Sequence, residues 1–113
     1  MEEEMASIRA RIEAEVGGWP GVEERSHRFG GVEFRVNGHE IGHLHGDRLA
    51  DLPFPRRVRE ELVEAGRAEV HHVLPETGWV SYRIGGEGDV EGALDLFRRN
   101  YERLTARREV EGS

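Results

Sequence analysis

The chain has 113 residues, a net charge of −7 at neutral pH, no cysteine and no lysine. This length fits one domain, the missing cysteine excludes disulfides, thiolate nucleophiles and cysteine-type zinc sites, and the missing lysine excludes Schiff-base catalysis. The acidic balance argues against nucleic acid and anionic membranes as partners.

The first half of the sequence predicts one helix followed by three strands. Residues 2–16 carry apolar side chains at helical spacing and end at two glycines. The next three segments, 22–29, 31–37 and 39–46, are predicted as strands separated by glycine-containing turns. We expect the helix to cover one side of the sheet that these strands form.

An Asn37-Gly38 pair joins the last two of these strands. Asn-Gly between alternating apolar segments is the strongest short-range hairpin signal, because a type I′ turn needs positive φ at both centre positions. Pairing outward from the turn predicts the cross-strand neighbours Val36–His39, Arg35–Glu40, Phe34–Ile41 and Val32–His43. One face of the hairpin then carries Val32, Phe34, Val36, His39, Ile41, His43 and His45. The apolar face is therefore predicted to end in imidazoles, where we look for a functional site.

The second half of the sequence predicts a second hairpin between two helices. In chain order it gives a loop with two prolines over 47–55, a helix over 55–65, strands over 68–74 and 79–84, a helix over 89–104, and a frayed tail over 105–113. The order is α-β-β-β-α-β-β-α. It predicts a single compact α+β domain over 1–113, with its core at about 5–104, whose antiparallel sheet is covered by helices on one side.

His43 and His45 are the candidate catalytic residues. Their i,i+2 spacing on a strand aims two imidazoles at one point, and Asp47 continues the same parity. Two histidines and a carboxylate can hold iron, zinc or manganese. Because only one close ligand pair is visible, we expect no stoichiometric metal and no cofactor. The alternative is that both are structural histidines bonded to backbone at a sheet end.

Further candidate residues lie in the second hairpin and the helix before it. One hairpin face is predicted to hold His71, Val73, Val80, Tyr82 and Ile84, and the other Val70, His72, Leu74, Trp79 and Ser81. Adjacent histidines cannot both point inward. Arg56 begins an arginine-rich helical turn that either forms i,i+4 pairs with glutamates or binds an anion. The candidate ligand-binding residues are Asp47, His72, Trp79, Tyr82 and Arg56.

Three segments of the chain, 31–47, 50–55 and 71–82, resemble the luciferase-domain family. The signatures are Gly-His-Leu-His-Gly-Asp and Leu-Pro-x-x-Gly-Trp-Val-Ser, and the resemblance covers about residues 18–104. This family of small bacterial, archaeal and fungal domains includes the fungal luciferase that acts on 3-hydroxyhispidin. The resemblance therefore implies a luciferase-like oxidoreductase of the monooxygenase type.

Two functions follow as hypotheses. The first is a small-molecule-binding domain that acts as a cofactor-independent oxygenase on an enolisable aromatic, with molecular oxygen as co-substrate. There a neutral histidine takes the acidic proton, and an arginine or second histidine steadies the anion. The second is a non-catalytic binding or regulatory module, with DNA binding as in the small double-wing domains as its specific version. A basic strip of Arg25, Arg28, Arg35 and Arg48 favours DNA, and the net charge opposes it.

The sequence also predicts where the protein is found. No apolar run is long enough to span a bilayer, and the acidic start is unlike a signal peptide. We therefore expect a soluble cytoplasmic protein without a membrane partner. The sequence leaves the oligomeric state open.

Overall fold

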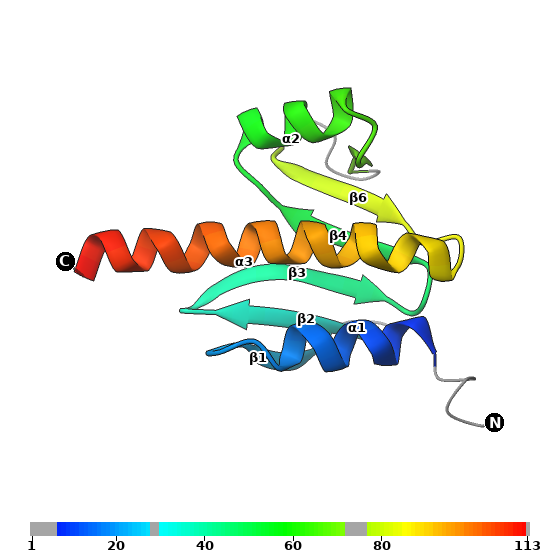
Figure 1. The fold of residues 1–113 in the computed structure, drawn as a ribbon, viewed down its shortest axis with the longest axis horizontal. Coiled ribbons are helices and arrows are strands. Elements are labelled where there is room, and N and C mark those ends of the chain that lie inside the picture. Colours follow the sequence, from blue (N-terminus) through cyan, green and yellow to red (C-terminus); the bar gives the residue numbers. More distant parts are fainter. Residues whose placement is uncertain (1–6, 28–29, 72–76, 113) are drawn as a thin grey trace.

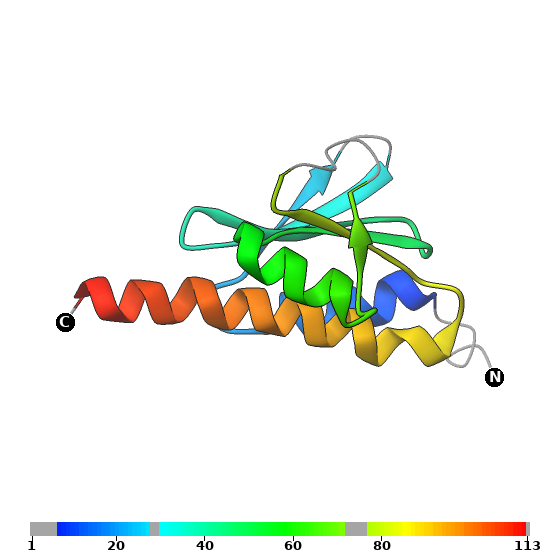
Figure 2. The ribbon, with the colours of Figure 1, turned by 90° about the horizontal axis from the view of Figure 1, so that it is seen from above.

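The structure is a computed structural model that describes residues 7–27, 30–71 and 77–112. Its elements are α1 (Ile8–Gly17), β1 (Glu23–His27), β2 (Gly31–Val36), β3 (His39–His45), β4 (Leu49–Pro53), α2 (Arg56–Glu64), β5 (Glu69–Val70), β6 (Trp79–Arg83), the 3₁₀ turn η3 (Glu87–Asp89) and α3 (Val90–Gly112). The strands form one antiparallel sheet in the order β1-β2-β3-β4-β6-β5 (Figure 1). The α-helices lie together on one side of this sheet (Figure 2). The predicted α+β architecture is confirmed.

Strand β4 corrects the prediction of a loop over 47–55. Two prolines suggested irregular chain, but Pro53 is the last residue of the strand and Pro55 lies beyond it. Ala50 and Leu52 are fully buried, whereas Asp51 between them points to the opposite side of the pleat. Because β4 pairs with β3 and with β6, it is an interior strand of the sheet.

The register of the β2–β3 hairpin is confirmed only next to its turn. Val36 does pair with His39 and Arg35 with Glu40, but Phe34 pairs with Gly42, and Val32 with Leu44. Ile41 is thus an extra residue, which makes a β-bulge. A shift of one residue moves each following side chain to the other face. The expectation that the imidazoles share a face with the apolar core is therefore wrong.

The core lies between the sheet and α3. Phe34 on β2 meets Phe97 on α3 edge to face, with ring centroids 5.5 Å apart. The bulge is bonded to the same helix, since Nδ2 of the fully buried Asn100 donates to the carbonyl oxygens of Ile41 at 2.8 Å and Pro53 at 2.9 Å. Helix α3 therefore fixes the positions of β3 and β4 relative to each other.

Two further boundaries differ from the predicted ones. Helix α3 does not end near residue 104 but continues to Gly112, which replaces the predicted frayed tail by helix. Strand β5 has two residues, and most of the predicted strand beyond it falls at 72–76, outside the described residues. Within the described residues, no helix combines the length and the hydropathy needed to cross a bilayer.

Gly42 allows the close contact between β3 and its neighbours. A methyl group on Gly42 would lie 2.9 Å from the carbonyl oxygen of Asp51, 2.9 Å from Leu52 and 2.9 Å from Phe97. We therefore expect Gly42→Ala to lower the free energy of unfolding by about 1–3 kcal/mol in urea titrations, as overpacked positions do. Gly86→Ala, where a methyl group would meet nothing within 4 Å, is the control. Equal stability of the two variants would contradict this packing.

Candidate functional site

The bulge and β4 together place a row of polar residues across the sheet. The row consists of the Cα neighbours Glu33, His43, Asp51, Ser81 and Glu69, from β2, β3, β4, β6 and β5. Residues adjacent to this row along the strands, such as Gly42 and Leu52, face Phe97 of α3. Because side chains alternate, the polar row lies on the sheet face that the helices leave uncovered.

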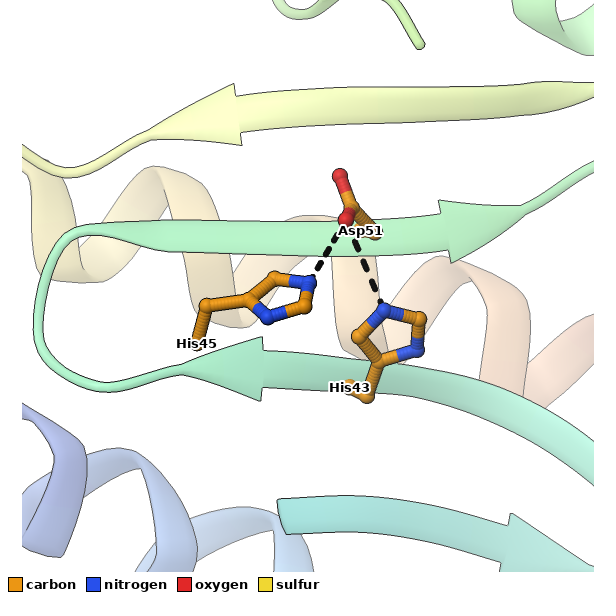
Figure 3. A group of neighbouring side chains, drawn as sticks. All are labelled: His43, His45 and Asp51. Carbon is orange, nitrogen blue, oxygen red and sulfur yellow. Dashed lines mark hydrogen bonds and ion pairs between the residues drawn. The ribbon is translucent and has the colours of Figure 1, made fainter. Parts of the chain in front are cut away.

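Asp51 is the centre of this row and is only 1% exposed. Its Oδ1 atom accepts a hydrogen bond from the Ser81 hydroxyl at 2.6 Å. Its Oδ2 atom lies 3.0 Å from Nε2 of His45 and 3.4 Å from Nε2 of His43 (Figure 3). Nε2 of His71 is also 3.4 Å from that oxygen. Three imidazoles thus converge on one carboxylate oxygen, and we call these four residues the histidine–aspartate cluster.

His43 is held by two carboxylates. Its Nδ1 atom is 2.7 Å from Oε2 of Glu40, on the side of the ring opposite Asp51. Burial by itself lowers the pKa of His43, but hydrogen bonds to Asp51 and Glu40, together with their charges, outweigh burial and raise that pKa to about 9. His43 is therefore a cation at neutral pH.

The same contacts keep Asp51 ionised. Burial raises the pKa of a carboxyl group. Here the hydrogen bonds from His43 and Ser81 and the charges of His71 and His43 outweigh burial, so that the pKa of Asp51 lies well below its ordinary value. The cluster consequently combines a buried negative charge with imidazoles that surround it.

Trp79 forms an aromatic wall beside the cluster. Its ring centroid is 5.5 Å from that of His43 and 5.8 Å from that of His71. His43 and His45 meet edge to face at 4.8 Å. The side chain of His45 is 36% exposed, against 9% for His43. The cluster is therefore open to solvent at His45.

Two hollows flank the cluster without enclosing it. One of about 250 Å³ includes Ser81 and is lined by Gly66, Arg67, Ala68, Glu69, Ser81, Tyr82 and Arg83. Another of about 510 Å³ lies past the β3–β4 turn and is lined by Ile8, Asp47, Arg48, Arg83, Ile84 and Gly85. The larger hollow is not lined by any residue of the histidine–aspartate cluster, so we place the candidate site by the convergence of side chains rather than by volume.

The structure brings together some of the residues singled out in the sequence. His43, His45 and Trp79 lie in or beside the cluster. Asp47 is exposed and accepts a hydrogen bond from the backbone N–H of Arg9 at the start of α1, 2.6 Å away.

The other candidate residues lie elsewhere. Tyr82 is on the helix-covered face, where its hydroxyl donates to the carbonyl oxygen of Asp89 at 2.9 Å. Arg56 is exposed at the start of α2. His72 lies outside the described residues.

Three members of the site were not among the sequence candidates: Glu40, Asp51 and Ser81. The sequence left open which of His71 and His72 faces the site, and the structure places His71 there. Asp51 was assigned to a loop, and only a strand over 49–53 paired with β3 would have placed it beside His43. Val70 pairs with Val80, so His71 follows on the Trp79 side of the hairpin, the side to which the sequence had assigned His72.

A family model described as Luciferase domain matches residues 38–100. The matched segment begins in the β2–β3 turn, ends at Asn100 of α3 and includes the whole histidine–aspartate cluster. No curated protein and no solved structure matches the chain.

Proposed function

We propose, from the premise that the chain belongs to the luciferase-domain family, that it binds a small enolisable aromatic molecule at the histidine–aspartate cluster and oxidises it with dioxygen. The observation that supports this proposal is the convergence of three imidazoles on the buried Asp51, beside the partly exposed Trp79. Clefts and surfaces that combine perturbed titratable groups with an aromatic wall are typical of small-molecule sites.

The cluster has the groups that such a reaction needs. Oxygenation of an enolisable ring starts when the enol oxygen loses its proton, and the electron-rich anion then reacts with dioxygen. A positive charge next to that oxygen stabilises the anion. His45 is the accessible imidazole, and His43 lies behind it between two carboxylates. The enol oxygen is thus expected to bind where these two histidines and Asp51 meet, with the ring against Trp79.

Fluorescence of Trp79 and oxygen uptake test this proposal. In a Trp19→Phe background, which leaves Trp79 as the one tryptophan of the chain, titration with 3-hydroxyhispidin without oxygen should give saturable quenching. With oxygen present, an oxygen electrode should record uptake that depends on the protein. His45→Ala should abolish the uptake because it removes the accessible imidazole.

The matched control is His39→Ala, since His39 is an exposed histidine on the same strand. It should leave both signals unchanged. Absence of quenching, or uptake that survives in His45→Ala, would contradict the proposed function.

The arginine strip that favoured DNA is partly neutralised. Arg25 pairs with Glu23 at 3.3 Å and Arg35 with Glu33 at 2.7 Å, and Arg28 lies outside the described residues. These pairs give DNA binding no structural support, and the expectation that nucleic acid is not a partner stays a prediction.

A further inference from the structure

The histidine–aspartate cluster has the donor atoms of a metal site. The sequence predicted no stoichiometric metal because only His43 and His45 formed a close pair, and the fold adds Asp51 and His71 to that pair. We propose that the cluster binds one divalent transition-metal ion through Nε2 of His43, Nε2 of His45 and Oδ2 of Asp51, with His71 beside the Asp51 carboxylate.

The distances fit coordination at a single point. One ligand atom from each of His43, His45 and Asp51 can be chosen so that all lie within 4.8 Å of one another. Neighbouring ligands bonded to an ion at about 2.0–2.1 Å are about 2.8–3.0 Å apart in octahedral geometry and about 3.3–3.4 Å apart in tetrahedral geometry. Oδ2 of Asp51 lies 3.0, 3.4 and 3.4 Å from the three Nε2 atoms. The ligand atoms of His43, His45 and Asp51 are therefore close enough together to bind the same ion.

The neighbours of the ligands supply an independent argument. A histidine that binds metal usually donates its other ring N–H to a carboxylate, and a ligating carboxylate is itself hydrogen-bonded. His43 has Glu40 at 2.7 Å from Nδ1, and Asp51 accepts from the Ser81 hydroxyl at 2.6 Å. Both outer contacts orient the ligands with Nε2 and Oδ2 directed at the shared point.

Charge and donor type indicate the class of ion. Imidazoles that bind a metal ion are neutral, so the two negative charges of Glu40 and Asp51 would then be balanced by a divalent cation. Imidazole nitrogen with one carboxylate favours zinc, iron, manganese or cobalt over calcium and magnesium, and two histidines with one carboxylate leave coordination positions open. The exposed side of His45 provides the entry path.

This inference deepens the proposed function and rests on it only for the role of the ion in the reaction. An ion at the shared point would take the place of the proton on His43 as the cation beside the enol oxygen. The sequence-based expectation of a cofactor-free oxygenase is then replaced by a metal-dependent one.

Calorimetric titration with Zn²⁺ tests the site without any substrate. The full chain, purified without a polyhistidine tag and stripped with a chelator, should bind one equivalent of Zn²⁺. Bound Co²⁺ should give visible absorption bands that disappear when Zn²⁺ displaces it. Glu40→Gln should weaken binding by about 10–100-fold, as loss of an outer partner does, and His45→Ala should weaken it further because a ligand is lost.

The controls separate this site from adventitious binding. His39→Ala, an exposed histidine on the same strand, should bind as the unchanged chain does. Asp51→Asn should no longer bind the equivalent of Zn²⁺. Because this variant removes a buried charge, its far-UV circular dichroism is recorded, and His45→Ala, with its partly exposed side chain, decides the result if Asp51→Asn does not fold.

The results also distinguish the two proposals. No stoichiometric Zn²⁺ binding, or binding unchanged in His45→Ala, overturns the metal site. If the chelator-stripped protein still consumes oxygen, the metal ion has no role in the reaction, and the proposed function stands without it. If one metal equivalent binds and its binding depends on His45, the metal site is supported. If that protein consumes no oxygen with Zn²⁺, Fe²⁺, Mn²⁺ or Co²⁺, the proposed oxygenase function is contradicted.

Discussion

Asp51→Ala is expected to lower the free energy of unfolding by about 3–5 kcal/mol, the range for removing one partner of a buried charge pair. The carboxylate is 1% exposed, and its loss leaves the Ser81 hydroxyl without its acceptor and the charged His43 with Glu40 but without Asp51. Urea unfolding in the presence of a chelator measures the effect, because bound metal would otherwise stabilise the folded state.

Two comparison variants show which atoms are responsible. Asp51→Asn retains an oxygen that can accept from Ser81, and it should therefore be less destabilised than Asp51→Ala. Asp95→Ala removes an exposed carboxylate from α3 and should stay within about 0.5 kcal/mol of the unchanged chain. If Asp51→Ala were as mild as Asp95→Ala, the cost of burying Asp51 would balance everything that its contacts contribute.

The features that the sequence predicted correctly depend on local chemistry. Asn37 and Gly38 have φ of 55° and 80°, as the two-residue turn requires, and the pairs next to the turn follow from it. The prediction of helices on one side of an antiparallel sheet follows from periodicity and turn positions alone. His43 and His45 were recognised because their spacing along one strand is itself a local property.

The face on which those histidines lie was not predictable from the hairpin. The bulge at Ile41 changes the register by one residue, and its carbonyl oxygen is bonded by a side chain 59 residues further along the chain. Alternation within 31–46 carries no trace of that contact. The imidazoles therefore lie on the uncovered face instead of at the end of the core.

The carboxylate of the cluster was missed for a related reason. The alternation of side chains along β3 predicted Asp47 on the same face as His43 and His45. The chain instead turns at Gly46, which has a φ of 62°, and Asp47 accepts a hydrogen bond at the start of α1. Asp51 reaches His43 only because β4 pairs with strands on both of its sides. Local residue preferences around Pro53 favour a loop, and pairing on two sides overrides them.

Asn100 is the residue on which the bulge depends, and Asn100→Asp is expected to lower the free energy of unfolding by about 2–5 kcal/mol. It removes the Nδ2 donor to the carbonyl oxygens of Ile41 and Pro53. Arg103 still donates to the Pro53 carbonyl at 3.4 Å, whereas the loss at the Ile41 carbonyl costs about 1–3 kcal/mol as for a buried group without its partner. The volume stays nearly constant, so the loss reports the missing hydrogen bonds and the buried carboxyl group rather than a cavity. Urea unfolding measures the stability.

The Asn100 variant also tests the link between helix α3 and the site. Without the bond to Ile41, the bulge can relax toward the regular register, which would direct His43 to the other face. We expect faster amide hydrogen exchange along β3 in Asn100→Asp. Arg99→Ala, an exposed neighbour on α3 that pairs with Glu61 at 3.2 Å, should change neither stability nor exchange appreciably. If β3 exchanged equally slowly in both variants, the bulge would be held by the sheet alone, and α3 would not position the histidines.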